Sequence, residues 1–74
     1  MTERRYLILI EADDPGCSAY APDLPGCVAT GGTREDVERE MHDAIAFHLE
    51  GLEETGELIP EPSGLTTAYV KVAT

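Results

Sequence analysis

The chain has 74 residues, with fifteen Asp and Glu against five Lys and Arg and a formal net charge of −10. This length predicts a single small domain over residues 1–74. A hydrophobic content of 42% is too high for a disordered acidic chain, and no apolar run approaches the ~20 residues of a membrane span. The acidity argues against direct binding to nucleic acid and favours a basic protein as partner.

The N-terminus lacks the apolar stretch and small-residue cleavage site of a secretory signal, so a cytoplasmic location is expected. Cys17 and Cys27 are too few for a disulfide scaffold and lack the close spacing of zinc ligands. We expect both to be small buried hydrophobic side chains.

Three strands are expected in the first half of the chain. Residues 5–11 form a nearly continuous apolar run, which predicts a central strand covered on both faces. Turn-forming residues at 12–16 predict a hairpin, after which 17–21 forms a second strand with Ser18 and Tyr20 on one face. Residues 27–31 return as the third strand.

The connection between the second and third strands has strong turn chemistry, Pro22, Asp23, Leu24, Pro25 and Gly26. Proline presets φ at the first central position of a type II turn, and glycine supplies the positive φ that the next position requires. A tight hairpin here places the two cysteines at opposite ends of the strand pair, too far apart for the ~7 Å limit of a disulfide.

One long helix is predicted from Thr33, its N-cap, to about Thr55, with Gly56 as the C-terminal stop. Spacings of three and four place one stripe of side chains on a single helix face: Val37, Met41, Ala44, Ile45, His48 and Leu52. Phe47 and Leu49 widen this stripe. We therefore expect Phe47, His48 and Leu49 to provide contacts in an oligomer.

Residues 66–73 alternate between two faces, as a half-buried fourth strand does, with Val70 and Val72 on one face and Tyr69 and Lys71 on the other. The predicted order β-β-β-α-β is an α+β fold, with an antiparallel three-stranded sheet, a fourth strand and one long helix packed on one face. Because that helix covers one face only, the doubly apolar first strand predicts self-association as a homodimer or tetramer.

The sequence offers little for catalysis. Glu11, Asp13 and Asp14 could hold a divalent cation, but no calcium-loop pattern surrounds them and a solvated turn is the preferred interpretation. His42 and His48 lie six residues apart on different helix faces, which is not the spacing of a metalloprotease pair. His48 is interpreted as a core or interface histidine, with a pH-sensitive partner contact as the alternative. We expect no enzyme activity, catalytic residue, cofactor or metal.

The C-terminal end of the helix is crowded with carboxylates, contributed by Glu50, Glu53, Glu54 and Glu57. Anions there oppose the helix dipole, because the C-terminal end carries its negative pole. One interpretation is a solvated outer face. The other is an electronegative surface that binds a basic partner, and it makes these four residues the candidate binding site.

The motif from Pro22 to Cys27, the pair Gly32 and Thr33 before the helix, and the sequence Ile-Pro-Glu-Pro at 59–62 resemble the HicB family of bacterial and archaeal antitoxins. The resemblance covers nearly the whole chain. It implies a partially degraded ribonuclease-H-like domain that forms dimers or higher oligomers and neutralises a small basic HicA-type mRNA-cleaving toxin. The first strand has apolar residues where a catalytic Asp would be expected, so nuclease activity should be absent.

Many HicB antitoxins carry a C-terminal helix-turn-helix or ribbon-helix-helix domain that binds the operator, whereas this sequence ends at Thr74. We therefore expect a short form without that domain. The predicted function is an antitoxin-like binding protein that neutralises a HicA-type toxin by protein-protein contact. The alternative is a stand-alone oligomeric structural or regulatory domain with no toxin partner.

Overall fold

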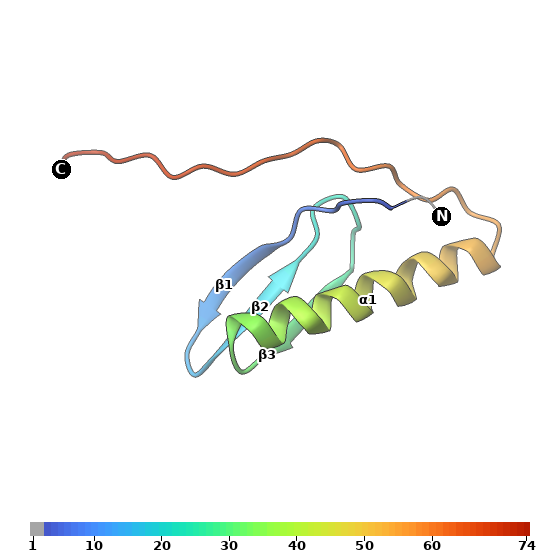
Figure 1. Ribbon diagram of the computed structural model, residues 1–74, viewed down its shortest axis with the longest axis horizontal. Helices are drawn as coiled ribbons and strands as arrows, with labels where there is room; N and C mark the ends of the chain where they lie inside the picture. The colour runs from blue at the N-terminus through green and yellow to red at the C-terminus, as the bar shows by residue number, and fades with distance from the viewer. Residues whose placement is uncertain (1–2) are drawn as a thin grey trace.

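The computed structural model describes residues 3–74 and shows an α+β arrangement of one antiparallel sheet and one helix (Figure 1). The strands pair in the order β1-β2-β3, and the long helix lies across one face of the sheet. The elements are β1 (Leu9–Asp13), β2 (Gly16–Tyr20), β3 (Val28–Gly31) and α1 (Arg34–Glu54). The predicted fold class and the predicted helix are confirmed.

The central strand is β2, which pairs with both of its neighbours. Ala19 lies opposite Ile10 of β1 and Ala29 of β3, and only 4% of its surface is exposed. Tyr20, the next residue, is 44% exposed. This alternation confirms the predicted faces of the second strand, because successive side chains in a strand point to opposite sides of the sheet.

The first strand differs from the prediction in its bounds and in its place. A central strand over 5–11 was expected, but β1 begins at Leu9, continues through Ala12, and lies at the edge of the sheet. The strand extends further because Asp14 and Pro15 alone reverse the chain, so that Ala12 pairs with Cys17. The apolar run is therefore half-buried, and β2 is its only neighbouring strand among the described residues.

The core lies between the sheet and α1. Its largest fully buried side chains are Leu24, Val37 and Met41, with exposures of 0%, 0% and 1%. Val37 and Met41 belong to the predicted helix stripe, and Leu24 comes from the loop between β2 and β3. The core is small, and its centre is at the N-terminal half of the helix.

The loop between β2 and β3 is the predicted turn. Cys27 donates its backbone N–H to the Leu24 carbonyl over 3.0 Å, and Gly26 has a φ of 84°. These are the hydrogen bond and the positive φ of a type II turn with Pro25 at its first central position. The turn buries Leu24 and Cys27 while Pro25 and Gly26 stay exposed. Cys17 and Cys27 are both free thiols, as expected.

After the helix, the chain returns across the molecule and is held by three side chains of the body. The Tyr6 hydroxyl donates a hydrogen bond to the Pro60 carbonyl, and Arg4 forms a 3.2 Å ion pair with Glu61. Asp23 accepts two hydrogen bonds from Ser63, from its backbone N–H over 3.0 Å and from its hydroxyl over 2.8 Å. These contacts fix the path of the chain up to residue 63.

Residues 64–74 do not form the predicted fourth strand. They are extended and exposed, with Tyr69 at 105%, Val70 at 81% and Val72 at 72% of full exposure. In Figure 1 they form the long orange and red segment that runs away from the body. A strand requires a neighbouring backbone to pair with, and within the described chain these residues have no backbone hydrogen bond to another segment. Residues 66–73 alternate between two faces as a strand does, but no strand among the described residues pairs with them.

Candidate protein-binding site

The C-terminal end of α1 is closed by a well-formed Schellman motif. Gly56 has a φ of 76° and donates its N–H to the Glu53 carbonyl, while Glu57 donates to the Leu52 carbonyl over 2.9 Å. The Thr55 hydroxyl also lies 3.2 Å from the Gly51 carbonyl. Gly56 stops the helix as predicted, because the left-handed conformation suits glycine. The helix end is therefore held by its own hydrogen bonds.

The four predicted acidic residues are brought together at this end of the helix. Glu50, Glu53, Glu54 and Glu57 are all exposed. Glu57 accepts a 2.8 Å hydrogen bond from Thr55, but within residues 3–74 none of the four forms an ion pair with a Lys or Arg. The last helical turn contains no basic residue. The cluster is an uncompensated negative surface at the negative pole of the helix.

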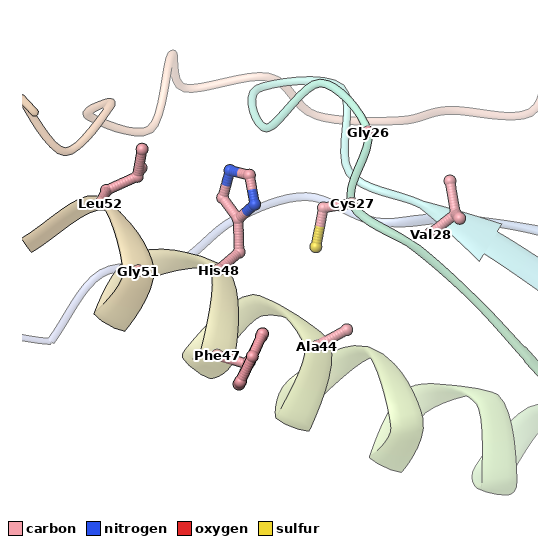
Figure 2. A pocket seen from close by; sticks show the side chains of 8 residues that line it. All are labelled: Gly26, Cys27, Val28, Ala44, Phe47, His48, Gly51 and Leu52. Atoms are coloured by element: carbon pink, nitrogen blue, oxygen red, sulfur yellow. The ribbon is translucent and has the colours of Figure 1, made fainter. Parts of the chain in front are cut away.

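An apolar groove of about 400 Å³ lies next to this cluster, between the C-terminal half of α1 and the start of β3. Figure 2 shows the imidazole of His48 pointing from the helix toward the turn that contains Gly26 and Cys27. The groove is lined by Gly26, Cys27, Val28, Ala44, Phe47, His48, Gly51 and Leu52. The absence of a side chain at Gly51 leaves one wall of this groove open.

The predicted oligomer contacts do not form one surface. Phe47 and His48 both line the groove, and Phe47 is 79% exposed, too exposed to belong to the core. Leu49 instead packs against the core and lines a different pocket beside Tyr6 and Ile45. The structure therefore assigns Phe47 and His48 to the candidate binding site and Leu49 to the side of the helix that faces the N-terminal segment.

Cys27 lies in this groove as a buried free thiol. It is 5% exposed, and burial raises the pKa of its thiol above the ordinary 9.0. A thiol with a raised pKa is a poor nucleophile, because the thiolate is the reactive form. Cys27 therefore acts as a small hydrophobic side chain, which agrees with the sequence interpretation.

The other chemical candidates remain separate from one another. His42 lies 3.2 Å from Asp43 on the exposed side of the helix, and His48 faces the groove. Glu11 is exposed on β1 and Asp14 on the following turn. The side chain of Asp13 lies outside the described part of the structure, and among the described side chains no group of three His, Cys, Asp or Glu lies close enough to hold a metal ion. None of the described helices is both long and apolar enough to cross a membrane.

The apolar groove, the second part of the candidate site, was not predicted from the sequence. Cys27 and Val28 come from the turn and from β3, and the helix side chains meet them only after folding. The one signal available was the helical spacing that brings Ala44, Phe47 and His48 to one side of α1. An exposed phenylalanine next to that stripe marks the opening of the groove.

Within residues 3–74, the structure thus combines a small α+β domain with an acidic surface that no Lys or Arg compensates and an apolar groove beside it. Residues 6–72 match the sequence model of the HicB_like antitoxin of bacterial toxin-antitoxin systems. This chain belongs to that antitoxin family. The resemblance stated from the turn and cap motifs is confirmed.

Individual relatives support the same family. Antitoxin HicB 2 of Photorhabdus laumondii is 32% identical over 68 residues, which are 92% of this chain and 49% of that protein. An uncharacterized 14.9 kDa protein of Haemophilus phage HP1 is 38% identical over 56 residues, 76% of this chain and 42% of the phage protein. UPF0150 protein Ta0767 of Thermoplasma acidophilum is 32% identical over 57 residues, 76% of this chain and 83% of that protein. The chain thus spans about half the length of the first two relatives.

Proposed function

We propose that this chain binds a small basic mRNA-cleaving toxin of the HicA class and neutralises it by protein-protein contact. The observation that carries the proposal is a set of four carboxylates beside an apolar groove, Glu50, Glu53, Glu54 and Glu57, which have no cationic partner in the part of the chain that the structure describes. Membership of an antitoxin family supports it. The proposal places the binding in the cytoplasm, where mRNA is translated, and gives this chain no catalytic step.

The two parts of the site have different roles in such a contact. Exposed carboxylates attract a basic protein over long range and raise the rate of encounter. An apolar groove of this kind accepts an apolar or aromatic anchor from the partner, and desolvated anchors dominate interface energies. Phe47 at the rim and Leu52 at the acidic end place these two parts within one contact area.

The position of the acids supports binding over mere solubility. Each carboxylate in the last turn opposes the helix dipole by about 0.3–1 kcal/mol. Acidic residues in the first turn, such as Glu35 and Asp36, have the opposite effect and stabilise the helix. Carboxylates that served only solubility would gain nothing from a position at the C-terminal end of α1, where the helix dipole is unfavourable. A partner that brings Lys or Arg to this end would offset the repulsion between the carboxylates and the negative pole of the helix.

The test uses the protein encoded by the neighbouring reading frame, which this proposal expects to be small and basic. Calorimetric titration of that protein is expected to give a stoichiometric complex, and co-expression is expected to relieve its toxicity. The double variant Glu53→Gln and Glu54→Gln should weaken the complex by roughly tenfold, because each lost charge contact at a partly solvated rim is worth about 0.5–1 kcal/mol.

The matched control is Glu35→Gln with Glu40→Gln, which removes the same charge from the other half of the helix, where both side chains are exposed. It should change the affinity by less than about twofold, since these residues lie away from the groove. Equal weakening by both pairs would show a general charge effect and contradict the site. If the wild-type chain neither binds nor protects against that protein, the stand-alone oligomeric or regulatory domain becomes the better description.

A further inference from the structure

Gly51 lies in the last turn of α1 and forms part of the helix wall of the apolar groove. A β-carbon built at this position meets nothing within 4 Å, so close packing does not require glycine there. The backbone does not require it either, because the described glycines with a positive φ are Gly26, Gly56 and Gly64. Glycine is also a poor helix former. The feature that its missing side chain does affect is the groove.

The space over Gly51 is large enough for an aromatic ring. Figure 2 shows Gly51 on the helix between the side chains of His48 and Leu52. The groove has a volume of about 400 Å³, whereas a cavity of about 150 Å³ already holds a benzene molecule. A side chain with one ring therefore fits, with room for the backbone that carries it. A larger residue at position 51 would fill part of this space.

Both walls of the groove expose apolar side chains. Among residues 3–54, the exposed large hydrophobic side chains are those of Tyr20, Val28 and Phe47. Two of them line the groove, Val28 from β3 at 65% exposure and Phe47 from α1 at 79%. Exposed apolar side chains that gather in one place mark a site for an apolar occupant. The rings of Phe47 and His48 favour an aromatic occupant, because aromatic rings attract one another by stacking or edge-to-face contact.

The described chain does not cover this groove with another segment. The residues that line it belong to α1 and to the stretch 26–28. The groove lies beside β3, at one edge of the sheet, and β1 forms the other edge. Residues 64–69 run along the β1 side, where they line open spaces together with Ile8. An occupant of the groove therefore has to come from another molecule.

Charge distinguishes between the molecules that could supply it. The groove ends at Leu52, directly before the exposed carboxylates of Glu53 and Glu54. A second copy of the chain is a poor match, because its net charge is −10. Three of its five Lys and Arg side chains already form ion pairs with its own carboxylates, namely Arg4, Arg34 and Arg39. A segment that is rich in Lys or Arg complements the carboxylates.

We propose that the groove over Gly51 is an aromatic-anchor site. One aromatic side chain of the partner enters the groove, and Lys or Arg residues next to it in the partner contact Glu53 and Glu54. Gly51 determines specificity, because a larger side chain would take the place of the ring. This inference rests on the proposed function, in which the partner is a basic toxin. It adds that the bound segment of that partner is an aromatic residue flanked by basic residues.

The first test is the variant Gly51→Leu, measured by surface plasmon resonance against the protein encoded by the neighbouring reading frame. The dissociation rate should rise at least tenfold, because the ring loses its site. The association rate should stay within twofold of the wild-type value, because the carboxylates that act on encounter are kept. Circular dichroism should show at least the wild-type helix content, since leucine is a better helix former than glycine. Weak binding would then not be due to unfolding.

The matched control is Ala46→Leu, which adds similar bulk at an exposed position of α1 that lines a different pocket. It should change both rates by less than twofold. A Gly51→Leu variant that dissociates at the wild-type rate would overturn the aromatic-anchor site. The proposed function would still stand if the double variant Glu53→Gln and Glu54→Gln weakens the same complex.

The second test needs no toxin. The acetylated and amidated peptide Lys-Lys-Phe-Lys-Lys is titrated into the isotope-labelled chain and followed by nuclear magnetic resonance. Amide signals of Gly26, Val28 and Gly51 should shift, whereas the same peptide with serine in place of phenylalanine should shift those of Glu53 and Glu54 alone. Shifts confined to the acidic end with both peptides would overturn the aromatic-anchor site. Entry of the phenylalanine peptide into the groove, combined with no binding of the neighbouring protein, would support the site and contradict the proposed function.

Discussion

At the scale of single residues, one of the two tightest glycine positions is Gly31, where β3 meets the first turn of α1. A methyl group added at Gly31 would lie 2.6 Å from the backbone nitrogen of Val37. Backbone cannot move aside as a flexible side chain can. The short passage from β3 into the helix therefore depends on this glycine, and so does the burial of Val37.

Replacing Gly31 by alanine is expected to lower the free energy of unfolding by about 1–3 kcal/mol, the usual cost of forcing extra volume into a packed contact. Urea unfolding followed by circular dichroism measures this. The matched control is Gly51→Ala in the last turn of the helix, where the added methyl meets nothing within 4 Å. It should raise the free energy of unfolding by about 0.5–1 kcal/mol, because alanine is the better helix former. Equal effects of the two changes would contradict this account of Gly31.

Tyr6 joins the N-terminal segment to the return path of the chain through its hydrogen bond to Pro60. Burial raises the pKa of its phenol above 10.0, against the opposing effect of Arg4 and with the support of Glu61 and Asp23. Because the folded-state pKa is the higher one, this contribution to stability is complete below pH 10 and is lost as the pH rises through the folded-state value.

The change Tyr6→Phe should therefore lower the free energy of unfolding by about 1 kcal/mol at pH 8, the net worth of one hydrogen bond. The difference between the two proteins should shrink above pH 10, where the wild-type phenol loses its proton as well. Urea unfolding at pH 8 and pH 11 measures both values. A difference that stays constant with pH would show that the hydroxyl proton has no part in the contact.

At the scale of whole elements, sequence reasoning succeeded where the determining interactions are local. Thr33 caps the helix by accepting the Asp36 N–H over 3.1 Å, and Gly56 closes it, both as predicted. The turn at Pro25 and Gly26 could equally be predicted from the sequence, because a fixed φ at proline and a positive φ at glycine are properties of the residues themselves.

Sequence reasoning failed where the position of an element depends on segments that are distant in the sequence. The apolar run at 5–11 predicted a central strand, but the place of a strand in a sheet depends on which segments join it, and residues 66–73 remain unpaired here. The candidate site also has a part that one element determines and a part that depends on distant segments. The carboxylates that end at Glu57 could be read from one helix, whereas the groove between His48 and Cys27 exists only after β3 has packed beside α1.

The acidic end of α1 predicts opposite effects of one change on stability and on binding. Glu53→Lys with Glu54→Lys should raise the free energy of unfolding by about 1–2 kcal/mol, because cations suit the negative pole of the helix and repulsion among the carboxylates is removed. The same variant should bind the proposed basic toxin at least tenfold more weakly. Thermal unfolding and calorimetric titration measure the two effects.

The control is Glu35→Lys in the first turn, where the same substitution meets the positive pole. It should lower the free energy of unfolding by about 0.3–1 kcal/mol and leave toxin binding nearly unchanged. If the pair at 53 and 54 instead proves necessary for stability, the carboxylates have a structural role in the free protein and the argument for a binding surface loses its main support.

At the scale of the whole molecule, the net charge of −10 acts on the proposed association with a basic toxin. It attracts the toxin to the end of α1 over long range. Salt weakens this attraction, because the screening length falls from about 10 Å at 0.1 M to about 3 Å at 1 M ionic strength.

Raising the salt concentration from 0.05 to 0.5 M should therefore slow association with the toxin by about tenfold, with little change in the dissociation rate, because long-range attraction acts on encounter. Surface plasmon resonance measures both rate constants. An association rate that does not change with salt would contradict long-range attraction of the toxin by the acidic end of α1.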